Sequence, residues 1–258
     1  MMRNVFWGML DLKQQQDQIN PTLLLIGDSW FWYPFDNLAI EIGARFQQQV
    51  LLVIGRNGSE AGDWATKERK DIERAFDWYA AGVRGLLLSG GGNDIAGLND
   101  FMRLLKADCS HAQSVADCYR IGQPAATLTG IEGAYRAVIE KFRAYNPTAP
   151  VFVHQYDHAW PTGQGVFGPA NWLKEPMEAA RVPVGLRRAL FKDLIGGLRD
   201  MQLGLSLVAS LRVVLIQSAG TLPEDTSMWA NELHPTPEGF RLLAREAFVP
   251  ALKGEGIA

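Results

Sequence analysis

Short apolar runs alternate with segments of helical periodicity along most of this chain. The runs are nearly continuous in Leu, Val and Ile, which is typical of strands that are covered on both faces of a sheet. They are Thr22 to Ile26, Val50 to Ile54, Gly85 to Leu88, Pro150 to Tyr156 and Leu211 to Gln217. The alternation predicts an α/β fold, a three-layer αβα sandwich around a flavodoxin-like, doubly wound parallel sheet of about five strands.

The segments between and after these runs have the apolar spacing of helices. They are Leu38 to Gln49, Trp64 to Ala81, Gly130 to Tyr145, Leu186 to Leu207 and Pro237 to Leu252. The last one begins after Thr236, a good N-cap residue, and has proline at its first position. We therefore expect strands and helices to follow one another in strict alternation.

Two stretches interrupt this alternation, residues 96–127 and 158–184. Each follows the carboxyl end of a predicted strand, so we expect loop or lid insertions over the active site, with ordinary surface loops as the alternative. Gly163 to Gly168 matches the dinucleotide pattern G-x-G-x-x-G, but it does not lie directly between a strand and a helix. We expect no nucleotide site there, and a single domain over residues 1–258.

Composition narrows the class of protein further. The chain has 258 residues, of which 47% are hydrophobic, enough for the core of one large domain. Its net charge is −3 and its basic residues are scattered, which argues against nucleic acid as the main partner. Arg212 breaks the most apolar stretch, so we expect no membrane span. Met1 to Leu10 lacks the features of a secretory signal, and we expect a cytoplasmic protein.

Cysteines and histidines give little sign of a metal site. Cys109 and Cys118 are the only cysteines, and they can be free thiols or a local disulfide. His111 near them stands alone on a polar segment. His154 and His158 are widely separated on a predicted strand, so we expect no metal there. We expect no cofactor either.

Residues suited to a hydrolase site stand near the ends of the apolar runs. Ser29 is a candidate nucleophile, Gly62 and Asn93 are candidates for binding an oxyanion, and His234 is a candidate base. Because the carboxyl ends of parallel strands form one crevice, we expect the four to meet there. Each also has a simpler explanation as a helix cap, a tight turn or a solvated histidine. Their order along the chain favours a serine hydrolase.

Four blocks of sequence resemble the SGNH hydrolases, also called the GDSL esterase and lipase family. The blocks are Gly27-Asp28-Ser29-Trp30, with Trp in place of the usual Leu; Asn57 to Asp63, where Gly58 stands one position early; Gly91-Gly92-Asn93-Asp94, a full match; and Asn231 to Pro235. They span residues 27–235, nearly the whole chain. The resemblance implies the SGNH hydrolase fold and hydrolysis of ester bonds.

The resemblance also assigns roles to these residues. Ser29 attacks an ester carbonyl while His234 accepts its proton and later returns it to the leaving alcohol. The backbone N–H groups of Ser29 and Gly62 and the side-chain amide of Asn93 stabilise the oxyanion. Asp28 and Asp94, which belong to the same blocks, are expected to support the site.

Asn231 departs from the family pattern, which has aspartate at this position. An amide can accept the imidazole N–H bond but offers no negative charge to an imidazolium, and a change of this kind can cost ~10⁴ in turnover. We consider three outcomes and favour the first. Asn231 orients His234 in a working dyad; or a nearby acid such as Glu232, Asp225 or Glu224 replaces it; or the protein is a weak or inactive relative.

The expected substrate is a small-molecule ester with a small acyl or acetyl group. Aromatic residues cluster after the candidate nucleophile, from Trp30 to Tyr33, and again at Tyr156 and Trp160. If exposed, they favour an acyl chain or a sugar ring. Two alternatives remain open: a non-catalytic SGNH-like binding protein, and an acyltransferase or thioesterase that uses the same acyl-enzyme. The sequence does not indicate an oligomeric state.

Overall fold

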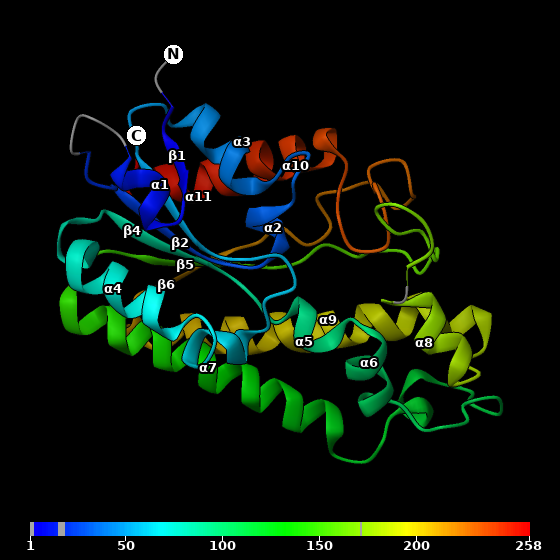
Figure 1. Ribbon diagram of the computed structural model, residues 1–258. Coiled ribbons are helices and arrows are strands. Elements are labelled where there is room, and N and C mark those ends of the chain that lie inside the picture. Colours follow the sequence, from blue (N-terminus) through cyan, green and yellow to red (C-terminus); the bar gives the residue numbers. More distant parts are fainter. Residues whose placement is uncertain (1–2, 15–18, 171) are drawn as a thin grey trace.

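A parallel sheet forms the centre of the protein (Figure 1). The computed structural model describes residues 3–14, 19–170 and 172–258, and within these residues the sheet has six strands in the order β1-β3-β2-β4-β5-β6. The strands are β1 (Val5–Trp7), β2 (Leu23–Gly27), β3 (Leu51–Gly55), β4 (Gly85–Ser89), β5 (Val151–His154) and β6 (Val213–Ile216). Every neighbouring pair is parallel.

Helices cover both faces of this sheet, which confirms the predicted three-layer α/β fold (Figure 1). One face carries α1 (Met9–Lys13), α2 (Ser29–Trp32), α3 (Leu38–Arg45), α10 (Pro237–Leu243) and α11 (Val249–Gly254). The other carries α4 (Arg69–Tyr79), α5 (Gly92–Ile95), α6 (Leu98–Leu104), α7 (Gln123–Tyr145), α8 (Lys174–Ala179) and α9 (Val184–Ser206). A short 3₁₀ helix, η1 (Ala61–Ala65), precedes α4.

The order of the strands places a crevice at one end of the sheet. From β2 onwards the order β3-β2-β4-β5-β6 is that of a flavodoxin-like doubly wound sheet. The chain leaves β2 for β3 on one side and then crosses to β4 on the other, so the direction of winding reverses between β2 and β4. Ligands of such sheets bind outside the carboxyl ends of the strands at this point. Ser29 follows β2 and Asn93 follows β4.

The sheet has one strand more than the predicted five or so. The extra strand, β1, has only three residues and adds to the edge of the sheet by pairing with β3. Three residues are too few to give a periodic pattern, and the strand depends on hydrogen bonds to a partner 46 positions away, Val5 opposite Leu51. It therefore could not be recognised from the sequence.

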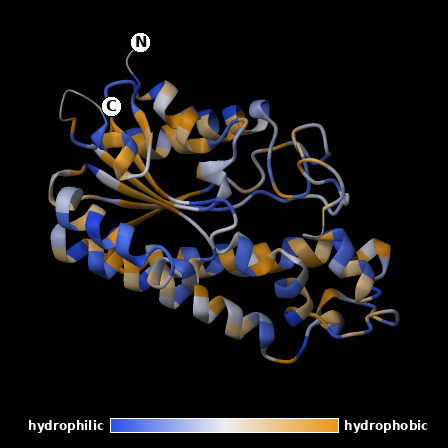
Figure 2. Cartoon of the chain, in the orientation of Figure 1, coloured by the Kyte–Doolittle hydropathy of each residue, from blue (hydrophilic) through white to orange (hydrophobic). Residues whose placement is uncertain are grey.

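The core follows the apolar pattern closely. The central strands β2 and β4 are buried along their whole length, and Figure 2 shows the strands as the most hydrophobic part of the molecule. Within the predicted helix from Gly130 to Tyr145, the buried residues of α7 have helical spacing; they are Ile131, Tyr135, Val138, Ile139 and Phe142. Among the described helices, none combines the length and the apolar character that crossing a membrane would require.

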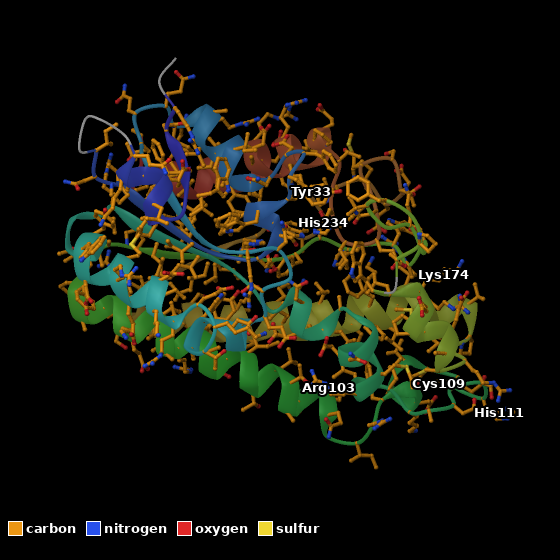
Figure 3. The ribbon with its side chains drawn as sticks, in the orientation of Figure 1. Tyr33, Arg103, Cys109, His111, Lys174 and His234 are labelled. Carbon is orange, nitrogen blue, oxygen red and sulfur yellow. The ribbon has the colours of Figure 1, made fainter. Side chains whose placement is uncertain are left out.

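The two interrupting segments lie in different places. The described residues of the segment 158–173, which exclude residue 171, are irregular and lead into α8, and some of them lie beside His234, as described below. Residues 96–127 contain α6 and the start of α7, and they line neither of the two cavities at Ser29. Cys109 and Cys118 in this segment are buried free thiols, and Figure 3 shows Cys109 far from His234.

Candidate active site

Ser29 lies just after the strand β2, at the start of the helix α2. Asp28 is the N-cap of α2, and its carboxylate accepts a hydrogen bond from the backbone N–H of Trp30 at 3.0 Å. Ser29 is the first residue of the helix, at the carboxyl end of the sheet. A Cβ atom on Gly27 would lie 2.5 Å from the carbonyl oxygen of Ser89, so only glycine lets β2 and β4 approach this closely at the end of β2.

Ser29 and His234 meet although 205 positions separate them. His234 Nε2 lies 2.7 Å from Ser29 Oγ. The histidine precedes α10, whose N-cap Thr236 accepts a hydrogen bond from the N–H of Gly239. The short segment that bears His234 is held by backbone hydrogen bonds from Ala230 N–H to the His234 carbonyl oxygen at 2.9 Å and from Thr236 N–H to the Met228 carbonyl oxygen at 2.8 Å.

Asn231 orients the imidazole. Its Oδ1 lies 3.0 Å from His234 Nδ1 and also accepts the backbone N–H groups of Leu233 and His234 at 3.0 and 2.9 Å. Its Nδ2 donates to the Tyr33 hydroxyl at 3.0 Å. With Oδ1 held as an acceptor, the imidazole carries its proton on Nδ1, and the lone pair of Nε2 faces Ser29. This is the tautomer that a general base requires.

Aromatic rings enclose the histidine. The Tyr33 ring stacks on the His234 ring with 4.2 Å between centroids and 10° between planes, and Trp172 meets it edge-on at 5.8 Å. Figure 3 shows Tyr33 and His234 side by side. His234 is only 6% exposed, and this burial lowers its pKa to about 4. Asn231 adds no negative charge that would oppose the shift.

Glu232, the second candidate for orienting His234, has another role. Its side chain is fully buried and accepts hydrogen bonds from the backbone N–H groups of Gly163, Leu173 and Lys174 at 2.8 to 3.0 Å. The carboxylate therefore anchors the 158–173 segment rather than the imidazole. Glu224, another of the acids considered above, pairs with Arg188 and Lys192 on the surface. Of the three outcomes considered for His234, the structure agrees with the first, in which Asn231 contacts the imidazole.

Asn93 lies beside Ser29. It is the second residue of α5 and lines both cavities that reach Ser29. Its Nδ2 donates to the carbonyl oxygen of Ser59 at 3.0 Å and, over a longer 3.4 Å, to Asp28. The N–H groups of the amide therefore point toward Ser59 and Asp28, next to Ser29. From this position one of them can rotate toward a substrate oxygen.

Gly62 lies in the first turn of η1. Within the described part of the chain, the backbone N–H groups of Ser29 and Gly62 form no hydrogen bond. Asp94 ties η1 to α5, because its Oδ2 accepts the N–H of Ala61 at 2.8 Å. Burial raises the pKa of Asp94 to about 6. The residues of this loop that line the cavity at His234 are Asn57 and Gly58, so the position of Gly62 in an oxyanion site stays a prediction.

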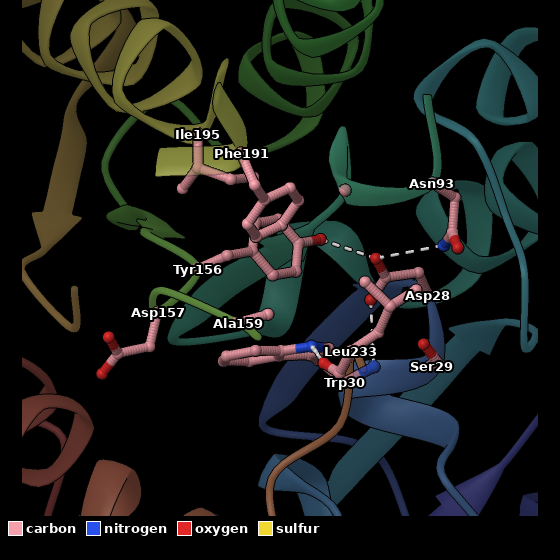
Figure 4. Close-up of a pocket in the computed structure, with 11 residues that line it drawn as sticks. Asp28, Ser29, Trp30, Asn93, Tyr156, Asp157, Ala159, Phe191, Ile195 and Leu233 are labelled. Atoms are coloured by element: carbon pink, nitrogen blue, oxygen red, sulfur yellow. Dashed lines mark hydrogen bonds between the residues drawn. The ribbon is translucent and has the colours of Figure 1, made fainter. Parts of the chain in front are cut away.

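A buried polar network lies beneath Ser29, and sequence reasoning missed it. Asp28 accepts a hydrogen bond from the hydroxyl of Tyr156 at 2.6 Å (Figure 4) and another from the hydroxyl of Ser89 at 2.8 Å. His154 Nε2 in turn lies 2.8 Å from Ser89 Oγ. Burial raises the pKa of Asp28 to about 6, and these hydrogen bonds oppose the shift. Tyr156 stood out as an aromatic residue and His154 as a possible metal ligand, but nothing local indicated that they bind Asp28.

Two cavities meet at Ser29. The first is walled by Tyr156 and Ala159 after β5 and by Phe191 and Ile195 of α9 (Figure 4). The second opens between Tyr33 and Pro34 on one side and Val166, Phe167 and Trp172 of the anchored segment on the other. At its mouth Phe167 is 92% exposed and contacts Phe35 edge-on. The serine hydroxyl is therefore reached from an enclosed side and an open side.

Comparison with known proteins adds to this geometry. No protein-family model matches the chain, and no curated protein matches it. Solved structures do. A phospholipase A1 from Streptomyces albidoflavus is similar over 92% of this chain and 100% of its own, with 17% identity and a TM-score of 0.53. A protein described as a GDSL-like lipase from Parabacteroides merdae covers 93% and 98%, with 10% identity and a TM-score of 0.54.

An acetyl esterase variant solved with an acetate ion is similar over 91% of this chain and 97% of its own, with 12% identity and a TM-score of 0.55. Identities this low establish a shared fold and no more. The chain therefore has the fold of the GDSL-type lipases and esterases, the SGNH hydrolase fold that its sequence blocks implied.

Proposed function

We propose that this protein is a serine esterase that hydrolyses a carboxylic ester with a small acyl group. The observation that supports this most strongly is the chain of contacts from Ser29 Oγ to His234 Nε2 at 2.7 Å and from His234 Nδ1 to Asn231 Oδ1 at 3.0 Å. A hydroxyl, a neutral base and a group that fixes the tautomer of the base form the arrangement that nucleophilic catalysis needs. The similar solved lipases and esterases agree with it.

In the first half of the reaction, Ser29 Oγ attacks the ester carbonyl carbon and its proton passes to His234 Nε2. The carbonyl π electrons move to the oxygen, which becomes an oxyanion. As the tetrahedral intermediate collapses, the bond to the alcohol oxygen breaks, and His234 returns the proton to that oxygen. The alcohol leaves and the acyl group remains on Ser29.

In the second half, water takes the place of the alcohol. His234 removes a proton from the water, the resulting hydroxide attacks the acyl-enzyme, and Ser29 recovers its proton from His234 when the acid leaves. Because Asn231 carries no charge, the imidazolium formed in each step receives less stabilisation than aspartate would give. We expect a working but modest turnover.

Three donors would stabilise the oxyanion. The N–H groups of Ser29 and Gly62, which have no partner among the residues that the structure describes, are available. Asn93 would exchange its long 3.4 Å contact with Asp28 for a bond to substrate. Such preorganised donors supply a large part of the rate enhancement of acyl-transfer enzymes. Asp28 and Asp94 act indirectly, through the helix and loop that carry these donors.

The enclosed cavity supports a short acyl group. Phe191 and Ile195 close it opposite Ser29, so a long chain would collide with α9. The open cavity, with Phe167 and Trp172 on its wall, would then receive the alcohol part of the ester.

Steady-state hydrolysis of p-nitrophenyl esters from acetate to octanoate tests the proposal. The native chain should prefer the shortest esters, and Ser29→Ala should be inactive on all of them. Ile195→Ala should move the preference to longer chains, whereas Leu207→Ala, an exposed leucine at the end of α9, should not. Equal rates of ester hydrolysis for the native chain and Ser29→Ala would exclude the mechanism. If both rates equalled that of the uncatalysed reaction, the result would favour a binding protein.

A further inference from the structure

The imidazolium of the proposed reaction has no carboxylate beside it among the described residues. His234 becomes positively charged when it takes the proton of Ser29, and the group at its other nitrogen is the neutral amide of Asn231. An amide oxygen has two lone pairs, and this one already serves three donors, the imidazole and two backbone N–H groups. Within the described part of the chain, His158 is the only histidine with a carboxylate within 4.0 Å of a ring nitrogen. Stabilisation of the charge on His234 therefore has to come from a group other than an acid.

The ring of Tyr33 lies flat against the ring of His234 (Figure 3). The centroids are 4.2 Å apart and the planes differ by 10°. Neutral aromatic pairs prefer offset or edge-on contacts at about 4.5 to 7 Å, whereas a cation is attracted to the negative face of a ring within about 6 Å. The other buried histidine, His154, stacks on Trp30 at 5.4 Å and 20°, so the contact of Tyr33 is both closer and more nearly parallel.

The surroundings of this contact strengthen it. Tyr33 is 4% exposed and His234 is 6% exposed, so water screens the pair very little. The attraction between a cation and a ring face is largest when both are desolvated. Trp172 also contacts His234, but its plane stands at 82° to the imidazole. Among the described residues, Tyr33 is thus the ring that stacks on His234 in parallel.

The Tyr33 ring is fixed before any charge appears. Its backbone N–H donates to the carbonyl oxygen of Ser29 at 2.6 Å, and its own carbonyl oxygen accepts the side-chain amide of Asn37 at 3.0 Å. Its hydroxyl accepts the side-chain N–H of Asn231 at 3.0 Å. One helical turn therefore joins the proposed nucleophile to the ring that covers the base. A group held in this way needs no rearrangement during the reaction.

We propose that the face of the Tyr33 ring is the electrostatic partner of the His234 imidazolium and partly replaces the aspartate charge that Asn231 does not supply. This inference rests on the proposed function, in which His234 takes the proton of Ser29. A ring that only positions His234 would act through its shape. A ring that stabilises the imidazolium acts through the electron density of its face, and the two roles can be separated by experiment.

Stepwise fluorination of the ring at Tyr33 tests the proposal. Tyr33→Phe comes first, followed by replacement of Tyr33 with difluorinated and then trifluorinated phenylalanine, which keep nearly the same shape while fluorine withdraws electrons from the ring face. The kcat for p-nitrophenyl acetate should fall only a few-fold with Tyr33→Phe. It should then fall by about a further tenfold over the two fluorinated rings, with KM unchanged, because the contact acts on the charge formed during the reaction.

The same fluorinated residues in place of Phe31 are the matched control. Phe31 is fully buried in the helix that Ser29 begins, and its ring contacts His154, which does not take part in the proposed reaction. Fluorination of Phe31 should leave kcat unchanged. A constant kcat across the fluorinated series at Tyr33 would overturn the proposal, and an equal fall in the series at Phe31 would overturn it as well.

NMR titration of His234 in the Ser29→Ala protein provides a second test, which does not require catalysis. The pKa of His234 should fall with each step of fluorination at Tyr33, because a poorer ring face attracts the charged imidazole less. A stepwise fall of this pKa without Ser29-dependent ester hydrolysis in the native chain would support the contact and overturn only the proposed function. A constant pKa would overturn the proposal even if the native chain is an active esterase.

Discussion

Within the described residues, the protein contains two buried serine–histidine pairs that share their geometry and differ in their surroundings. His234 Nε2 lies 2.7 Å from Ser29 Oγ, and His154 Nε2 lies 2.8 Å from Ser89 Oγ. Burial lowers the pKa of both histidines to about 4. By distance and by basicity alone, the two pairs are equally suited to deprotonate a hydroxyl.

Their surroundings separate them. Ser89 is 1% exposed, and its hydroxyl contacts Asp28, Tyr156 and His154, so no substrate atom can reach it. Ser29 lines two cavities and its backbone N–H has no partner within the described residues. A serine becomes a candidate nucleophile through access and free donors, and the hydrogen bond to histidine is not sufficient. The first pair faces substrate, and the second supports Asp28 from below.

The sharpest test of this contrast replaces each serine by alanine. Ser29→Ala should lower kcat by about 10⁴ to 10⁶ while leaving stability nearly unchanged. Ser89→Ala should keep most of the activity and lower the free energy of unfolding by about 1 to 3 kcal/mol, because its buried partners Asp28, His154 and Tyr156 each lose a hydrogen bond. Esterase kinetics and urea unfolding measure the two effects. A Ser89→Ala protein of native stability but without activity would reverse the assignment.

Asn93 carries the next largest expected effect. Asn93→Ala removes the amide donor beside Ser29 and should lower kcat by about 10² to 10³ with little change in KM, because the lost bond acts on the transition state. Asn57→Ala is a matched control, since Asn57 lines the same cavity, and it should change kcat only a few-fold. Unchanged turnover in Asn93→Ala would remove this residue from the mechanism.

Asn231→Asp should raise activity. A carboxylate would stabilise the imidazolium, so kcat should increase by about tenfold or more, toward the ~10⁴ that the reverse change costs in a Ser-His-Asp enzyme. Tyr33, whose hydroxyl now accepts from Asn231, can donate to the new carboxylate instead. The same variant should raise the pKa of His234 and move the acidic limb of the kcat/KM profile to higher pH. A slower variant with an unmoved limb would show that only an uncharged acceptor suits this site.

The pH dependence of the native protein follows from the low pKa of His234. A general base must be neutral, so kcat/KM should hold as the pH falls through 6.5 and decline toward about 4. Between pH 6.5 and about 4, the imidazole of His234 takes up a proton in the unfolded state but not in the folded state. The free energy of unfolding should therefore also fall as the pH falls from 6.5 toward 4. A limb near pH 6 would instead report Asp28 or Asp94, because burial raises the pKa of each to about 6.

Tyr33→Phe is the mildest change. It keeps the ring that stacks on His234 and removes the hydroxyl that accepts from Asn231 Nδ2. Since two backbone N–H groups still hold Asn231 Oδ1, we expect kcat to fall only a few-fold, with KM unchanged. The side chain of Asn37 donates a hydrogen bond to the backbone carbonyl oxygen of Tyr33, and this bond remains in the variant. A larger fall in kcat could therefore not be explained by displacement of this segment. A loss as large as that of Asn93→Ala would make the hydroxyl essential to the dyad.

Much of the architecture follows from local sequence. Apolar runs such as residues 22–26 and 85–88 became central strands, and the stripe from Ile131 to Phe142 became the buried face of α7. The helix α7 begins earlier than predicted, at Gln123, because Gly122 adopts a left-handed conformation with φ of 77° and Pro124 follows in the first turn. Ser29, Asn93 and His234 were found from residues at the ends of the apolar runs.

The remaining parts of the site depend on partners that are remote along the chain. Tyr156 reaches Asp28 across 128 positions, and Glu232 binds the N–H of Gly163 across 69, so neither role leaves a local pattern. Residues 96–127 and 158–184 looked alike as interruptions after a strand, yet only the second includes residues that line a cavity at Ser29.

Periodicity and the chemistry of single residues were enough to specify the sheet, its helical layers and the residues that could react, because burial of apolar faces depends on short spacings. Packing alone decided that Asn231, and none of the nearby acids, contacts His234. Packing also decided that His154 lies buried beside Ser89 and Asp28. Hydrogen bonds act over about 3 Å, and only the folded chain brings such distant residues within that range.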